Sequence, residues 1–217
     1  IVGCLPPEDM WKAYKGYNYT INLNSVKHSP TMFARRVYES LASGTPVISN
    51  YSEGVITQFG GIVCASDDID EITTYLEKIK NESVYKEAAD KGKREVLGRH
   101  TLADRLQKVC KRIGIDIKSH LPHIYMIVDA FSESDITRAL QIFKSQTYNK
   151  KRLVVNLKNI LTQYHYLNKS SDNVIYRADT EFKESFDDME INIVSGKDYA
   201  HTYLEDLAIK TQYEKSV

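Results

Sequence analysis

The stretch from Ser29 to Ser49 places one carboxylate inside a pattern that predicts a helix followed by a buried strand. Ser29 suits the N-cap of a helix, and Pro30 suits its first turn, where a missing N–H group costs nothing. Gly44 fits the left-handed position after a helix end. The predicted helix, from Pro30 to Ser43, would hold Glu39, whose carboxylate can accept hydrogen bonds from the hydroxyl groups of a ligand.

The start of this predicted helix is a candidate phosphate site. Backbone N–H groups in a first turn lack helical partners, and the helix dipole adds positive charge there. We therefore expect the amides of Thr31, Met32 and Phe33 to bind a phosphate. Arg35 could pair with the same anion, and His28 could hydrogen-bond to it or to a sugar. A surface salt bridge for Arg35 and a solvated loop position for His28 are the alternatives.

The run from Glu39 to Ile48 resembles the donor-binding helix of GT-B glycosyltransferases, in particular spore-maturation-type proteins with a family-1/family-4-like C-terminal half. In that family the Glu of E-x-x-A-x-G-x-P-V-I binds the ribose of a nucleotide-sugar, which implies this role for Glu39. Gly44 and Thr45 lie in the matched run and belong to the predicted site. Many relatives carry a second Glu near the donor sugar, where this chain has Thr31. An ordinary amphipathic helix with a surface Glu is the alternative.

The composition excludes several classes of protein. The 217 residues include 29 Lys and Arg and 29 Asp and Glu, and this balance argues against a nucleic-acid-binding protein. No apolar run is long enough for a transmembrane segment, and no signal-peptide pattern opens the chain. The three cysteines, Cys4, Cys64 and Cys110, lack metal or redox spacing and fit a reducing compartment, so we expect a cytoplasmic location.

Short apolar segments alternate with helical patterns along the chain, which predicts an α/β fold with a parallel sheet. In the first part we expect strands at 19–23, 47–48 and 59–63, a loop at 50–54, and helices before residue 17 and over 30–43, 69–79, 83–96 and 101–113. Asp67 or Asp68 would cap the helix at 69–79, and Thr101, with Asp104 three residues on, would cap the helix at 101–113, close to a capping box. Gly114 would stop this last helix. Its apolar face would consist of Leu102, Leu106, Val109 and Ile113, and the charged residues at 108–112 would form a solvated face. The resemblance implies that residues 1–118 form a Rossmann-like GT-B half-domain. Both ends of the chain look cut from a longer protein.

The second part, residues 119–217, resembles the opening of family-2-type, GT-A-like glycosyltransferases, with a strand at 123–128, a helix at 134–145 and a strand at 152–157. That family holds a divalent metal with the carboxylates of a D-x-D motif. Here the stretch from Ser195 to Asp198 offers one carboxylate and places Lys197 where the metal would lie. The family's paired Asp residues are replaced at Asn156-Leu157-Lys158. We expect a partial, degenerate domain without a metal site; a metal-independent variant using Lys197 is the alternative.

The resemblances together imply a glycosyltransferase that moves a sugar from a nucleotide-diphosphate donor to a glycan or protein acceptor. The first unit would bind the donor with neither a metal nor another cofactor, and the fragment would be inactive without an N-terminal half, which would carry any general base. No catalytic residue is assigned. Two alternatives stay open: a non-catalytic tandem α/β binding module, and a family-2-type transferase with catalysis in the second unit.

Overall fold

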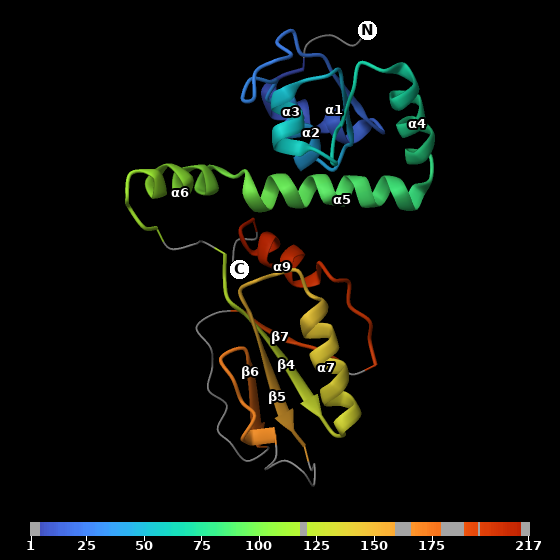
Figure 1. Ribbon diagram of the computed structural model, residues 1–217. Helices are drawn as coiled ribbons and strands as arrows, with labels where there is room; N and C mark the ends of the chain where they lie inside the picture. The colour runs from blue at the N-terminus through green and yellow to red at the C-terminus, as the bar shows by residue number, and fades with distance from the viewer. Residues whose placement is uncertain (1–4, 118–120, 159–165, 179–188, 195, 214–217) are drawn as a thin grey trace. The chain divides into compact units, whose positions relative to one another are not determined.

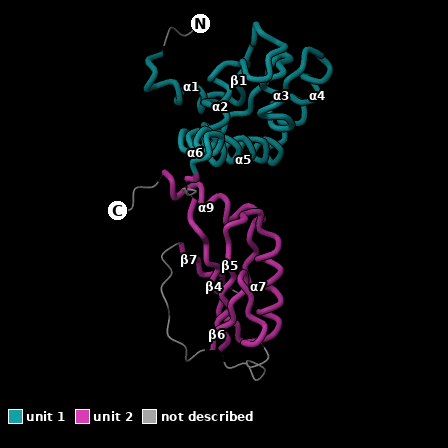
Figure 2. The backbone as a smooth tube through the Cα atoms, turned by 60° about the vertical axis from the view of Figure 1, so that its left-hand side comes forward, with its two compact units in different colours: residues 1–115 teal, residues 116–217 magenta. Residues whose placement is uncertain are grey.

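The computed structural model describes residues 5–117, 121–158, 166–178, 189–194 and 196–213. The fold is α/β with two sheets of parallel strands, which confirms the predicted fold class. The chain divides into two compact units, Ile1–Ile115 and Asp116–Val217, coloured teal and magenta in Figure 2.

The first unit has a three-stranded parallel sheet in the order β1-β2-β3, and Figure 1 labels the helices α1 to α6 of this unit. The strands are β1 (Thr20–Asn22), β2 (Val47–Ser49) and β3 (Cys64–Ala65). The helices are η1 (Pro7–Asp9), α1 (Met10–Gly16), α2 (Arg36–Ala42), α3 (Glu53–Phe59), α4 (Ile69–Ile79), α5 (Glu82–Arg99) and α6 (Leu102–Arg112). All three strands run the same way, so the loops that follow them meet at one edge of the sheet, where open α/β sheets bind ligands.

A small apolar core fixes α2 on this sheet. Val37 and Leu41, four residues apart on α2, are almost fully buried, and they belong to one cluster with Val47 of β2. Helix α2 also lies against α5. A Cβ atom at Gly92 of α5 would lie only 2.9 Å from Cδ2 of Leu41, so the glycine permits this close approach.

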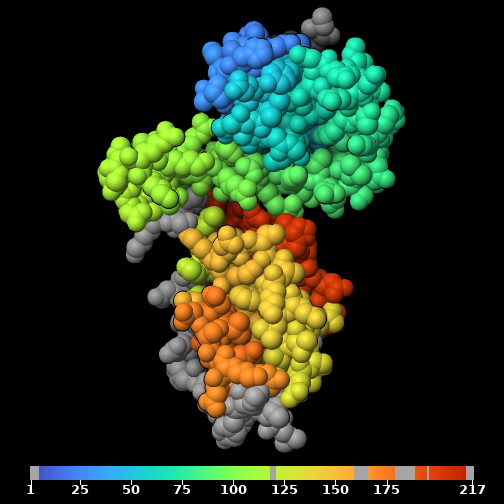
Figure 3. Space-filling model, in the orientation of Figure 1, coloured from blue at the N-terminus to red at the C-terminus, as the bar shows by residue number. Residues whose placement is uncertain are grey.

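Two predicted helix signals are confirmed at α6. Thr101 and Asp104 form the reciprocal capping box, and Gly114 ends the helix with φ of 78°. The predicted apolar stripe on this helix is exposed rather than packed; its members are Leu102, Leu106, Val109 and Ile113. The yellow-green atoms of Figure 3 show α6 at the surface of the first unit.

Two predictions after β2 are corrected. The segment interpreted as a loop from Asn50 to Gly54 contains the start of α3, because Ser52 accepts a hydrogen bond from the Val55 N–H group and caps the helix. The strand predicted at 59–63 lies further on, at β3, and only a bridge between Gly60 and Val63 precedes it. A seven-residue helix is too short to show a clear apolar period, which is why the sequence pattern missed it.

The second unit has a four-stranded parallel sheet in the order β6-β5-β4-β7. Its elements are β4 (Ile124–Ala130), α7 (Glu133–Ser145), β5 (Lys151–Leu157), β6 (Val174–Ala178), β7 (Met189–Asn192) and α9 (Tyr203–Thr211). The two strands and the helix predicted over 123–157 are confirmed, whereas β6 was not predicted. Ser195 and the expected boundary at residue 118 lie outside the described residues. Among the described helices, none has the length and apolar character needed to cross a bilayer.

Candidate functional site

The segment before α2 is a loop and not the first turns of a helix. The helix predicted to begin at Pro30 begins at Arg36, so the prediction of a capped helix start at Ser29 is wrong. The Ala34 N–H group donates instead to the side-chain oxygen of Asn24, at 3.4 Å. The amides of residues 31–33 therefore have no helix dipole behind them, and the physical basis given for a phosphate site there is absent.

Tertiary contacts hold this loop in place. The ring of Phe33 lies 5.4 Å from that of Tyr38 and 5.9 Å from that of Phe59, measured between centroids. A Cβ atom at Gly54 would lie 2.9 Å from the Phe33 ring and 3.0 Å from the carbonyl oxygen of Ser29. The loop can therefore lie against α3 only because position 54 has no side chain. Contacts of this kind come from distant parts of the chain, which explains why the local helix signals did not prevail.

We expect Gly54→Ala to shift this loop and to destabilise the first unit by about 1–3 kcal/mol, because the added methyl group meets backbone atoms of Ser29 and Met32. Urea denaturation followed by circular dichroism would measure the change. Gly16→Ala is the matched control, since a Cβ atom there meets no atom within 4 Å. Equal unfolding midpoints for the two variants would contradict the close packing described for Gly54.

A pocket of about 760 Å³ opens beside the loop, within the first unit. It is lined by Thr31, Phe33, Arg35, Tyr38, Gln58, His100, Leu102, Arg105 and Lys108. Its volume is in the range of small-molecule sites. Arg35, Arg105 and Lys108 are cationic and no acidic side chain is among the lining residues, so the pocket favours an anionic ligand.

An aromatic surface forms one side of this pocket. The guanidinium carbon of Arg105 lies 4.9 Å from the centre of the Tyr38 ring, a cation–π distance. Burial raises the pKa of the Tyr38 phenol above its ordinary value, and the charge of Arg105 partly opposes this. The His100 ring lies 5.5 Å from that of Tyr38, and its Nε2 atom is hydrogen-bonded to Glu95 at 3.1 Å. A flat group of an anionic ligand could pack against these rings while the cations hold its charge.

Glu39 is linked to the pocket through Arg35. It lies in the first turn of α2, and its Oε1 atom is 2.7 Å from Nε of Arg35. Its Oε2 atom accepts a hydrogen bond of 2.9 Å from the hydroxyl group of Tyr14, a residue of α1. Burial, together with the bond to Glu39, raises the pKa of the Tyr14 phenol. Each carboxylate oxygen can accept a second hydrogen bond, and the side chain is 35% exposed, so Glu39 can still accept bonds from ligand hydroxyl groups.

The structure brings together some of the predicted site residues and separates others. Thr31, Phe33 and Arg35 line one pocket. Met32, which lies between Thr31 and Phe33 in the sequence, has an exposed side chain. His28 lies in the loop after β1, with its ring 5.9 Å from that of Tyr51. The other two, Gly44 and Thr45, precede β2 and so lie at the opposite edge of the sheet, where Thr45 donates a 2.6 Å hydrogen bond to the carbonyl oxygen of Tyr14.

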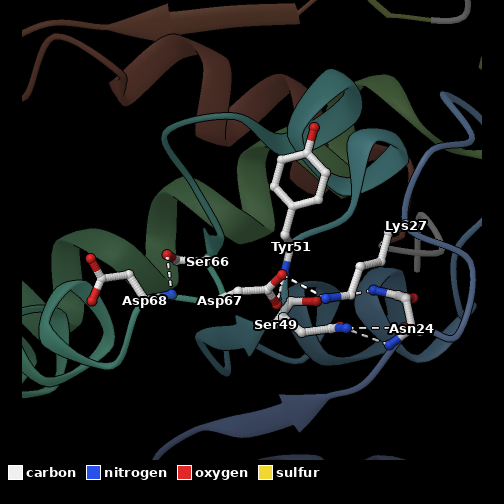
Figure 4. Close-up of polar contacts among 8 residues, drawn as sticks. Asn24, Lys27, Ser49, Tyr51, Ser66, Asp67 and Asp68 are labelled. Carbon is white, nitrogen blue, oxygen red and sulfur yellow. Dashed lines mark hydrogen bonds and ion pairs between the residues drawn. The ribbon is translucent and has the colours of Figure 1, made fainter.

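Polar side chains gather where β1 and β2 end (Figure 4). The side-chain amides of Asn22 and Asn24 both donate to Oγ of Ser49, at 3.1 and 3.0 Å. Asn50 bonds both backbone groups of Asn24, at 2.8 and 2.9 Å. Lys27 makes an ion pair with Asp67 in the same region. This network fixes the start of the loop that carries the pocket residues.

Several of these residues were not identified from the sequence. Tyr14 lies on α1, Tyr38 lies on α2, and Arg105 and Lys108 lie on α6, so no local spacing relates the three helices. The charged run at 108–112 indicated a solvated face for Lys108, whereas the structure places this residue in the pocket lining. The one available signal was the cap at Thr101, which predicts the helix that carries both cations.

In the second unit, Asp198 is fully exposed and its Oδ1 atom lies 3.0 Å from Nη2 of Arg138. The side-chain amide of Asn156 donates a 2.8 Å hydrogen bond to Asp129. Over the residues that the structure describes, no group of three or more His, Cys, Asp or Glu side chains is arranged to hold a metal ion.

In a comparison with protein families, residues 1–111 match the family described as glycosyl transferase-like. The matched region is just over half of the chain and contains the first sheet, Glu39 and the whole pocket. No curated protein and no solved structure matches the chain. The chain belongs to the glycosyl transferase-like family.

Proposed function

We propose that the first unit binds a nucleotide-diphosphate sugar and that the protein transfers this sugar to a glycan or protein acceptor. The observation that carries the proposal is the pocket in which Arg35, Arg105 and Lys108 converge beside an aromatic surface, with Glu39 bonded to Arg35. A nucleotide-diphosphate sugar offers the matching groups, which are a diphosphate, a flat base and ribose hydroxyl groups.

The cations would act on the diphosphate. In glycosyl transfer the bond between the sugar and the diphosphate breaks, and negative charge grows on the departing phosphate oxygen. Fixed positive groups beside that oxygen stabilise the transition state more than the ground state. Side-chain cations therefore take the role that the sequence had suggested for backbone amides at residues 31–33.

Glu39 would accept hydrogen bonds from the ribose hydroxyl groups, and the Tyr14 hydroxyl and Arg35 would orient its carboxylate. Gly44 and Thr45 would contribute indirectly, by ending α2 and tying it to α1. In this proposal the second unit does not catalyse transfer, because its one carboxylate at the motif position, Asp198, is paired with Arg138. Activity would also need an N-terminal half.

Titration calorimetry with uridine and guanosine diphosphates tests the proposal. We expect Arg105→Gln to weaken binding about fivefold, since a partly exposed charge pair contributes about 1 kcal/mol. Arg112→Gln removes the same charge from the same helix, outside the pocket lining, and should leave the affinity unchanged. An intact protein that binds neither nucleotide, or two variants with equal losses, would refute a donor site in this pocket.

A further inference from the structure

Asp67 makes two bonds to other loops with its carboxylate. Its Oδ2 atom lies 2.6 Å from Nζ of Lys27, and its Oδ1 atom accepts a hydrogen bond of 3.1 Å from the backbone N–H group of Tyr51. An ammonium group and an amide N–H group that converge on one anion are the donors with which proteins commonly bind phosphate. The side chains of Lys27 and Asp67 are 43% and 48% exposed, so a ligand can reach them.

These three groups come from the three loops at the ligand-binding edge of the first sheet. Lys27 follows β1, Tyr51 follows β2 and Asp67 follows β3 (Figure 4). The carboxylate therefore lies where an open α/β sheet binds its ligand. The bond from Lys27, together with that from the Tyr51 amide, lowers the pKa of Asp67 below its ordinary value, so the side chain stays negatively charged at neutral pH.

We propose that Lys27 and the Tyr51 amide form an oxyanion site for a phosphoryl group of the ligand, and that Asp67 occupies this site until the ligand displaces it. The inference rests on the proposed function, since it assigns part of that ligand to this edge of the sheet. A phosphoryl oxygen would accept the hydrogen bonds that Lys27 and the Tyr51 amide now donate to Asp67. Asp67, in the loop after β3, would then no longer bond to the loops after β1 and β2. Asp67 would therefore compete with the ligand for these two donors.

The competing interpretation is that Asp67 is a permanent clip between loops. The two interpretations predict opposite results for the loss of its charge. A clip residue supports the site, so its removal would weaken ligand binding. A competitor opposes the ligand, so its removal would strengthen binding.

The experiment measures binding of inorganic pyrophosphate and of uridine diphosphate to the full chain by calorimetry, and follows the Tyr51 amide by NMR. We expect Asp67→Asn to bind pyrophosphate about two- to fivefold more tightly, the range set by a half-exposed ion pair. Lys27→Met should bind pyrophosphate more weakly than the native protein does. The double variant that combines Lys27→Met with Asp67→Asn should also bind it more weakly than the native protein does. Lys27→Met alone should also raise the pKa of Asp67 toward its ordinary value.

Asp68→Asn is the matched control. It removes the same charge at the next position, and Asn retains the cap that Asp68 provides for α4. Its affinity for pyrophosphate should stay within about 1.5-fold of the native value, because an exposed charge outside the site is screened. Nucleotide binding serves to separate the two sources of the phosphoryl group. A gain in Asp67→Asn for uridine diphosphate as well as pyrophosphate indicates the donor, and a gain for pyrophosphate alone indicates a phosphorylated acceptor.

Three outcomes would overturn the inference: weaker or unchanged pyrophosphate binding in Asp67→Asn, an equal gain in Asp68→Asn, or no binding of either anion to any variant. The proposed function is tested separately. If uridine diphosphate binding depends on Arg105 and Asp67→Asn strengthens the binding of neither anion, the donor site stands and the inference fails. If Asp67→Asn strengthens pyrophosphate binding while uridine diphosphate does not bind, the oxyanion site stands and the donor proposal fails.

Discussion

Glu39→Gln is expected to weaken uridine diphosphate binding by at least tenfold. Hydrogen bonds to a charged group contribute about 1.5–3 kcal/mol, and the substitution removes the charge from the ribose contact. It also breaks the 2.7 Å ion pair with Arg35, which borders the pocket. Titration calorimetry would give the affinity, and circular dichroism would verify that the variant is folded.

Tyr14→Phe is the control for the Glu39 substitution. It removes the 2.9 Å hydrogen bond to Glu39 and leaves the carboxylate and its pair with Arg35 in place. The exposed carboxylate can replace the lost bond with water, so we expect a smaller loss of affinity than for Glu39→Gln. Native affinity in Glu39→Gln would rule out the ribose role. An equal loss in both variants would show that Tyr14 and Glu39 act only as a structural pair.

Leu41→Ala is expected to destabilise the first unit by about 2–5 kcal/mol, the usual cost of removing a buried leucine side chain. Leu41 is 1% exposed and packs α2 both on the sheet and against α5 at Gly92. Its loss would leave a cavity behind the helix that carries Glu39. Urea denaturation would measure the change in the free energy of unfolding from the unfolding transition of the first unit.

Leu102→Ala gives the matched comparison, because the same substitution is made at a position that is 84% exposed. Away from the core, a change of this kind should alter the free energy of unfolding by less than about 0.5 kcal/mol. A cost at Leu102 close to that at Leu41 would mean that the α6 stripe is buried in solution, and it would contradict the exposure described for it.

The elements that could be predicted from the sequence are those encoded by neighbouring residues. The capping box at Thr101, a cap at Asp67 or Asp68 and the stop at Gly114 each depend on contacts a few residues apart. The structure confirms the capping box and the stop, and it shows that Asp68 is the cap. The alternation of apolar strands with amphipathic helices likewise predicted the α/β class and the parallel sheets. The E-x-x-A-x-G-x-P-V-I run indicated a glycosyltransferase, and residues 1–111 match the glycosyl transferase-like family.

The site itself depends on contacts between distant residues. Local signals favoured a helix from Pro30, but two distant residues hold this segment as a loop. Asn24 accepts a hydrogen bond from the Ala34 N–H group, and Gly54 lets α3 lie close to the loop. Propensity contributes only tenths of a kcal/mol per residue, so such packing overrides it. The short helix α3 was missed for another reason, because its seven residues show no clear apolar period.

The charge pattern of the first unit was also decided by tertiary structure. Arg105 reaches the Tyr38 ring from a helix 67 residues further along the chain, and Asp67 reaches Lys27 from the loop after β3. No spacing in the sequence relates the members of either pair. The sequence therefore determined the class of the fold, its helix ends and its family, because these follow from neighbouring residues. Only the folded chain decided that Arg105 and Lys108 lie in one pocket with Arg35, and that Asp67 pairs with Lys27. The Lys27–Asp67 pair forms because parallel strands bring together loops that are far apart in the sequence.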